Sequence, residues 1–183
     1  MTLDFSPFFS LLSVVLPIYL VLRRPWRYDW KRETLVGVFA LYFLFLLFLT
    51  LRNGTWGTPL QLLHRAQTRL NTMDRVNLRP FFTIRLFFHP GLEKAFLINV
   101  VGNVVMFLPF GFFLPLLWKQ NRSLLRLLLF PLLLTVTIES IQLLIGRQPD
   151  VDDVMLNALG GYLGEGLFFL LKRMFPAIEE LQK

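Results

Sequence analysis

The sequence predicts an all-α membrane protein with about five transmembrane helices and an amphipathic, interfacial segment between the second and the third. Three observations support this prediction: 55% of the 183 residues are hydrophobic, the mean hydropathy is +0.56, and long stretches carry no charge. An α-helix rises about 1.5 Å per residue, so roughly 20 apolar residues cross a hydrocarbon core of about 30 Å. We therefore expect a single polytopic membrane domain over residues 1–183.

Five apolar runs are long enough to form spanning helices. Pro7 and Pro17 flank or interrupt the first run, and the last two runs each contain one acidic residue, Glu139 and Glu165. The first run has no basic residue before it and several after it. This is the reverse of a secretory signal peptide, so we expect a retained anchor. The predicted helices cover residues 5–22, 34–51, 95–118, 126–145 and 154–172.

The basic residues predict an N-terminus outside and a C-terminus in the cytoplasm. The link between the first two helices holds five Lys or Arg, and the link between the third and fourth holds Lys119 and Arg122. Links rich in such residues normally stay in the cytoplasm. The link before the fifth helix has only Arg147 against three aspartates, so we place it outside. The link over 52–94 conflicts with this assignment, because it holds seven Lys or Arg on the outer side.

The long second link is predicted to lie on the membrane surface. In its first half, four apolar residues fall on one face of a possible helix, as in interfacial helices, and two arginines lie off that face. These are Leu60, Leu63, Leu70 and Met73, with Arg65 and Arg69. Pro80 interrupts any helix there, and an aromatic run follows up to Phe88. The segment is either a surface-anchored connector or a lid over the outer ends of helices three to five.

Polar side chains in the third, fourth and fifth predicted helices converge at one depth. Asn99 and Asn103 share a face by their i, i+4 spacing, and Glu139 and Gln142 share one by their i, i+3 spacing. Because successive helices alternate in direction, these residues and the start of the fifth helix fall in the same half of the membrane. Polar groups in hydrocarbon normally face a bundle interior or a wet cavity. The candidate ligand-binding residues are therefore Asn99, Asn103, Glu139, Gln142, Arg147, Asp150, Asp152, Asp153 and Asn157.

Each of these candidates also has a structural interpretation. The amides can form interhelical hydrogen bonds. Arg147 can pair with Glu139, or it can contact a phosphate or carboxylate of a ligand. The three aspartates can cap the fifth helix or, as a weaker alternative, hold a divalent cation. We predict no metal site and no cofactor.

Small residues and prolines are predicted to shape the bundle. Gly160 and Gly164 form a GxxxG pair, which lets a neighbouring helix approach closely. Pro109 is expected to kink the third helix near the middle of the membrane. The structural candidates are Pro109, Gly111, Gly160, Gly161 and Gly164.

Composition excludes several function classes. The chain has no cysteine, which rules out disulfides and thiol chemistry. Its net charge of +7 is explained by topogenic residues and by contact with anionic headgroups, so no nucleic-acid partner is implied. The helices hold no Ser–His arrangement and no HExxH motif, which argues against protease chemistry. The lipid bilayer is the partner that composition does imply, and the oligomeric state is left open.

Three blocks of the sequence contain polar residues, prolines and glycines at defined spacings. Residues 97–111 contain Asn-x-x-x-Asn followed by Phe-x-Pro-x-Gly, and residues 138–161 contain Glu-x-x-Gln, Gly-Arg, Asp-x-Asp-Asp and Asn-x-x-Gly in that order. Upstream, residues 77–84 contain Asn-Leu-x-Pro-Phe and Thr-Ile. In order and spacing these blocks resemble the VanZ-like family of bacterial integral membrane proteins. The resemblance covers residues 77–164, and Pro149 is a small departure from it.

The resemblance implies a bacterial protein of the cell envelope. Members of the family are associated with low-level resistance to teicoplanin and related lipid-bearing glycopeptide antibiotics. The resemblance supplies this phenotype rather than a reaction, and many relatives occur outside resistance clusters.

Residues and resemblance together support three hypotheses. In the first, the outer-leaflet polar site binds a lipid-linked cell-wall precursor or a lipoglycopeptide. Arg147 would meet its phosphate or carboxylate, Asn103 and Asn157 its polar groups, and residues 77–88 its apolar part. In the second, the chain is an intramembrane enzyme that acts on an envelope lipid, with Glu139 and Asp153 as acid and base. In the third, it is a non-catalytic assembly protein whose polar stripe packs against a partner helix.

Overall fold

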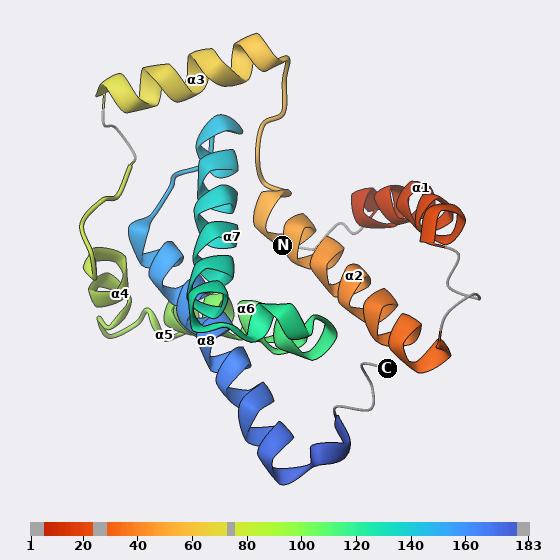
Figure 1. Cartoon of the computed structure of the whole chain (residues 1–183). Coiled ribbons are helices and arrows are strands. Elements are labelled where there is room, and N and C mark those ends of the chain that lie inside the picture. The colour runs from red at the N-terminus through yellow and green to blue at the C-terminus, as the bar shows by residue number, and fades with distance from the viewer. Residues whose placement is uncertain (1–5, 24–28, 73–75, 179–183) are drawn as a thin grey trace.

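The computed structural model describes residues 6–23, 29–72 and 76–178, and within these ranges the secondary structure is helical (Figure 1). A π-helical stretch, Leu97–Val101, joins α5 to α6, and a 3-10 turn, Lys119–Arg122, precedes α7. The helices are α1 (Ser6–Arg23), α2 (Trp30–Leu51), α3 (Pro59–Thr72), α4 (Phe82–Phe87), α5 (Glu93–Phe96), α6 (Gly102–Leu117), α7 (Leu124–Leu144) and α8 (Val151–Met174).

Four helical stretches in the described residues are long and apolar enough to cross a membrane. They are α2, the continuous stretch from α5 to α6, α7 and α8, with 22, 25, 21 and 24 residues. A shorter apolar helix, α1, precedes them. Many leucine and phenylalanine side chains on these helices are exposed, as expected for side chains that contact lipid. The chain is therefore an all-helical, multi-pass membrane protein, with four clear candidate spans where the sequence predicted about five.

Two of the spans begin about one turn earlier than the sequence predicted, because aspartates cap them. The Asp29 carboxylate accepts the backbone N–H of Lys31 (2.7 Å) at the start of α2. The Asp150 carboxylate accepts the backbone N–H of Asp152 (2.8 Å) at the start of α8. A carboxylate stabilises this end of a helix by satisfying a free N–H and by facing the positive end of the helix dipole.

The helices α6 and α8 run in the same direction and form the closest packing in the bundle. A Cβ atom on Gly160 would collide with the backbone carbonyl of Val104, and one on Gly164 would collide with that of Leu108. Only glycine allows two backbones to approach this closely. The GxxxG pair of α8 is thus used within the chain itself.

A second close approach brings α6, α7 and α8 together around Gly161. A Cβ atom on Gly111 of α6 would collide with the Gly161 carbonyl, and a Cβ atom on Gly161 would lie 2.6 Å from the Pro131 ring of α7. These residues lie in the middle of their helices. The three helices therefore form the centre of the bundle, and the polar end of α8 is held against α6 and α7.

The tyrosine hydroxyl of Tyr42 joins α2 to α6. It donates to the carbonyl of Met106 (2.7 Å) and accepts the N–H of Phe110 (3.2 Å). These two backbone groups lie on either side of Pro109, which removes one N–H from the helix. The hydroxyl therefore satisfies backbone groups next to the proline, and α6 continues through Pro109 to its end. Buried apolar side chains pack nearby, among them Leu46, Phe107 and Ile138.

The helix α3 lies across the ends of α2 and α7 (Figure 1). We call this side of the molecule the α3 end. Ala66 of α3 is buried, whereas Leu60, Leu63 and Leu70 are exposed. This is the arrangement expected of a helix that lies in the membrane interface. Met73, the fourth apolar residue of the predicted face, lies outside the described residues.

Candidate functional site

The segment before α4 lies alongside the link between α7 and α8, near the α3 end. Asn77 and Asp150 form an isolated parallel β-bridge. The N–H of Asn77 donates to the Pro149 carbonyl (3.1 Å), and the N–H of Val151 donates to the Asn77 carbonyl (3.0 Å). Backbone hydrogen bonds therefore join two segments that are far apart in the sequence.

Side chains reinforce the same junction through the Asp150 carboxylate. The Asn77 amide donates to one carboxylate oxygen (2.8 Å), and the Thr83 hydroxyl donates to the other (2.5 Å). The Asn77 amide also donates to the Thr83 hydroxyl oxygen (3.1 Å). Asp150 thus caps α8 and orders the segment before α4 with a single side chain.

Asp152 holds the first turn of α4 in place. Its side chain is fully buried, and its two oxygens accept the backbone N–H groups of Phe81 (2.5 Å) and Ile84 (3.0 Å). These are N–H groups that a helix start leaves without an intrahelical partner. Phe81 has a φ of 63°, a left-handed conformation that is uncommon for a large side chain. The buried carboxylate therefore stabilises a backbone conformation that the sequence alone disfavours.

Glu139 and Asp153 form the centre of the polar site. The Glu139 carboxylate accepts the backbone N–H of Asp150 (3.1 Å), and the Asp153 carboxylate accepts the amide of Asn103 (2.7 Å). The two carboxylates repel each other, and the charge of Arg147 attracts both. Each makes one hydrogen bond to the described chain, so each keeps acceptor capacity for a ligand. Three of the predicted clusters, from α6, α7 and α8, therefore meet here.

Arg147 contacts the end of α2 rather than a carboxylate. Its guanidinium group donates to the carbonyl of Thr50, and the amide of Gln142 donates to the same oxygen (3.2 Å). The described structure gives no contact ion pair between Arg147 and Glu139. A cation at the C-terminal end of a helix is favourable, because free carbonyls and the helix dipole are negative there. Arg147 thus joins α7 to α2 while its charge still acts on the nearby acids.

Asn99 does not join the cluster. Its amide donates to the carbonyl of Ala95 in its own helix (2.8 Å), and its side chain is exposed, whereas Asn103 contacts Asp153. The sequence predicted a shared face from an α-helical spacing. Asn99 lies in a π-helical stretch, Leu97–Val101, one turn before Asn103, and its side chain bonds within that helix instead of reaching the aspartates.

The rest of the polar stripe on α8 lies deeper and faces the interior of the described bundle. The amide of Asn157 donates to the Thr135 hydroxyl (3.2 Å), and Glu165 is buried further along the helix. The carbonyl oxygens of Asn157 and Gln142 and one oxygen of Glu165 are buried and have no hydrogen-bond partner. The stripe is thus enclosed by helices of the same chain.

An apolar groove lies next to the start of α4, beside Asp152. It has a volume of about 460 Å³ and runs between the start of α4, α7 and α8. Phe81 and Ile84 line one side of it, and both donate their backbone N–H groups to Asp152. The opposite side is formed by α7 and α8, mainly Leu132, Val154, Met155, Ala158, Leu159 and Tyr162. Within the described residues, no group of three or more His, Asp or Glu is arranged to hold a metal ion.

Sequence reasoning left several contributors out of the candidate list. Asn77 and Thr83 stood in the upstream block of the family pattern, so that block was the signal that could have found them. Thr135 is a hydroxyl in an otherwise apolar run, one turn before Glu139. Thr50 accepts hydrogen bonds from Arg147 and Gln142 through its backbone carbonyl, and no residue pattern reveals such a contact. Arg69 donates to the backbone carbonyls of Gly146 and Arg147.

The fold and the site together define a class of protein. It is a multi-pass helical membrane protein whose carboxylate and amide side chains gather near one end of the bundle, beside an apolar groove. The family model of VanZ/LLP1 matches residues 38–172, so the chain belongs to the VanZ/LLP1 family.

One relative gives a more detailed comparison. Protein VanZ of Enterococcus faecium is 36% identical over 73 residues, which are 39% of this chain and 45% of that protein. The match therefore spans less than half of the relative's length. No solved structure matches the chain.

Proposed function

We propose that this protein binds a lipid-linked or lipid-bearing ligand of the bacterial envelope at its polar site. The ligand class includes lipid-linked cell-wall precursors and lipoglycopeptides such as teicoplanin. The observation that supports this best is the apolar groove, because two of its wall residues, Phe81 and Ile84, donate their backbone N–H groups to Asp152 of the polar site. A groove and a polar cluster that share a wall suit a molecule with an acyl or prenyl chain and a polar head.

The polar site is suited to hydrogen-bond donors of a ligand. Glu139 and Asp153 each keep free acceptor capacity, and carboxylates accept hydroxyl, amide and ammonium groups. Sugar hydroxyls and peptide N–H groups are such donors. Arg147 adds a positive charge close by for a phosphate or carboxylate, although its guanidinium group already contacts the Thr50 carbonyl.

The orientation belongs to the same proposal. We place the N-terminus outside, the C-terminus in the cytoplasm, and α1 as a fifth crossing. The α3 end and the carboxylates then lie at the outer leaflet, where lipid-linked wall precursors and lipoglycopeptides are found. The basic links before α2 and before α7 support this orientation by the positive-inside rule.

The absence of cysteine makes the orientation simple to test. A single cysteine in place of exposed Gln148, between α7 and α8, should react with a membrane-impermeant thiol reagent in intact cells. A cysteine in place of exposed Gln120, before α7, should react only after lysis. The reverse pattern would overturn the proposed orientation.

The binding proposal is tested by teicoplanin susceptibility in a sensitive host. Empty vector, wild type and Glu139→Gln are compared at matched membrane abundance. Glu93→Gln is the matched control, because Glu93 is an exposed carboxylate at the start of α5. We expect wild type and Glu93→Gln to protect and Glu139→Gln to fail. Equal protection by wild type, Glu93→Gln and Glu139→Gln would show that the function does not need the Glu139 carboxylate.

A second candidate function is supported by the same two carboxylates. Glu139 and Asp153 are close enough to interact electrostatically, and such a pair can serve as general acid and base. The chain would then be an intramembrane enzyme that acts on an envelope lipid. Incubation of the reconstituted protein with lipid-linked wall precursors, followed by mass spectrometry, separates this function from binding. A product that Asp153→Asn fails to form would favour the enzyme.

A further inference from the structure

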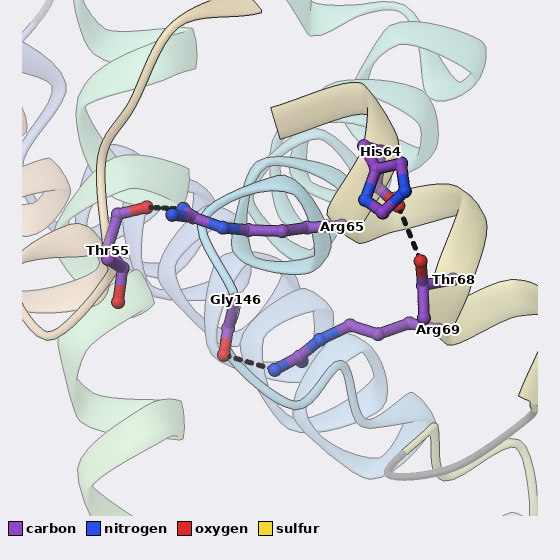
Figure 2. Close-up of a pocket in the computed structure, with 6 residues that line it drawn as sticks. All are labelled: Thr55, His64, Arg65, Thr68, Arg69 and Gly146. Atoms are coloured by element: carbon purple, nitrogen blue, oxygen red, sulfur yellow. Dashed lines mark hydrogen bonds between the residues drawn. The ribbon is translucent and has the colours of Figure 1, made fainter. Parts of the chain in front are cut away.

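A second cavity lies at the α3 end, apart from the apolar groove. It has a volume of about 410 Å³ and opens between α3, the segment after α2 and the link between α7 and α8. Figure 2 shows the six residues that line it: Thr55, His64, Arg65, Thr68, Arg69 and Gly146. None of these residues belongs to the polar site described above.

Two arginines of α3 extend across this cavity to different parts of the chain. Arg65 donates to the carbonyl of Thr55 (2.5 Å), and Arg69 donates to the carbonyl of Gly146 (2.6 Å), as Figure 2 shows. Arg69 also donates to the carbonyl of Arg147. Both side chains are half-buried. Their spacing of four residues puts the two guanidinium groups on one face of α3. The backbone contacts thus hold the two guanidinium groups in fixed positions, and both terminal nitrogens of Arg69 already donate to carbonyls.

The lining of the cavity is cationic. Two of its six residues carry a permanent positive charge, His64 adds an imidazole, and none is acidic. Backbone carbonyls accept hydrogen bonds from a guanidinium group but do not neutralise its charge. A guanidinium group has several N–H donors, and Arg65 uses one of them on Thr55. Arginine forks match the oxygen spacing of phosphate groups and bind them in a bidentate manner.

The position of α3 places this cavity at the depth of lipid headgroups. Leu60 is 78% exposed, Leu63 60% and Leu70 52%, so the bundle leaves these apolar side chains uncovered. A helix with such a face lies at the boundary between headgroups and acyl chains. Basic residues at this depth are attracted by anionic headgroups. This also gives a reason for arginines on a side of the membrane where the positive-inside rule disfavours them.

We propose that the cavity between Arg65 and Arg69 binds a phosphoryl group. The group belongs either to an anionic phospholipid headgroup or to a soluble phosphate ester, and the cavity has room for it. This proposal concerns a different cavity from the polar site, so it does not depend on the ligand proposed there.

The chain offers a matched control pair. Arg79 and Arg85 are exposed, lie next to α4, and also flank a cavity, of about 340 Å³. Neither guanidinium group forms a hydrogen bond to the described chain. The double variant Arg79→Gln/Arg85→Gln therefore removes the same charge as the double variant Arg65→Gln/Arg69→Gln. It differs in removing guanidinium groups that no hydrogen bond holds in position. Fixed donors bind more tightly than mobile ones because less conformational entropy is lost on binding.

The experiment uses the full chain in nanodiscs of phosphatidylcholine. One arm titrates inorganic phosphate by calorimetry, and the other replaces part of the lipid with phosphatidylglycerol and measures lipid retention by native mass spectrometry. We expect the Arg65/Arg69 double variant to lose about tenfold or more in affinity for at least one probe, because charge-assisted hydrogen bonds to the phosphoryl oxygens are lost. We expect the Arg79/Arg85 variant to change by less than about twofold.

The two arms separate the two sources of the phosphoryl group. Retention of phosphatidylglycerol without phosphate binding identifies a lipid headgroup, and the reverse identifies a soluble phosphate ester. Failure of wild type to bind either probe, or an equal loss in both double variants, overturns the proposal. Arg65→Lys with Arg69→Lys keeps the charge and a donor to each carbonyl, but it lacks the fork. If the glutamine pair prevents folding, an unchanged affinity in this lysine pair overturns the bidentate site.

Discussion

Replacing Asp152 with asparagine is expected to release the first turn of α4 while the helix bundle stays assembled. The two oxygens of the buried Asp152 carboxylate accept the N–H groups of Phe81 (2.5 Å) and Ile84 (3.0 Å). Asparagine offers one acceptor oxygen and turns an amide N–H₂ toward the second N–H. One charge-assisted hydrogen bond is therefore lost, which costs about 1.5–3 kcal/mol. The free energy of opening this turn should fall by that amount.

Relief of repulsion works in the opposite direction. Asp152 lies near other carboxylates, and its charge acts on Asp153. Loss of one negative charge stabilises such a cluster, so the net effect should lie near the lower end of the range. That corresponds to about a tenfold increase in the opening equilibrium of the turn.

Hydrogen–deuterium exchange of the reconstituted protein measures this opening directly. In Asp152→Asn the amides of residues 81–84 should exchange about ten times faster than in wild type, while amides in the centre of α8 stay protected. Asp153→Asn is the control, because it removes the same charge one residue away without any contact to α4. Unchanged exchange in Asp152→Asn, or equal acceleration in both variants, would refute the assigned role of the Asp152 carboxylate.

Two further predictions concern the packing of α6. Gly164→Ala should lower the free energy of unfolding by about 1–3 kcal/mol in a denaturant titration, because the added methyl group collides with the backbone carbonyl of Leu108. Gly166→Ala is its control and should be neutral or slightly stabilising, since open space surrounds that position. Tyr42→Phe should cost about 0.5–2 kcal/mol in the same titration, because the hydroxyl bridge from α2 to the Met106 carbonyl is lost. Equal effects of both glycine variants, or a neutral tyrosine variant, would contradict these packing arguments.

The sequence predicted the membrane-crossing helices well because hydropathy is a local property. The runs at residues 34–51, 95–118, 126–145 and 154–172 all lie in observed helices, with ends that differ by up to about one turn. The differences at the starts of α2 and α8 have one cause. Asp29 and Asp150 act as caps, so charged residues that lie outside the apolar run still belong to the helix.

Which candidate residues contact one another could be predicted in part, and that part also rested on local information. A short link joins α7 to α8, so Glu139 and Asp153 have to lie near each other whatever the rest of the chain does. To predict the contact of Asn103 with Asp153, one more inference was needed, namely that successive helices alternate in direction. Asn99 shows the limit of that reasoning, because its spacing from Asn103 did not bring it to the aspartates: its side chain is exposed and bonds within its own helix.

The sequence by itself determined that this chain crosses the membrane several times and that several of its polar side chains lie near the same ends of their helices. Only the tertiary structure decided what those side chains contact. Arg147 contacts the Thr50 carbonyl, Asp152 orders the start of α4, and Arg69 holds α3 against the link between α7 and α8. The physical reason is one of range. Membrane partition sums over roughly 20 neighbouring residues, whereas a hydrogen bond requires two atoms within about 3 Å, and distant segments meet that closely only through packing.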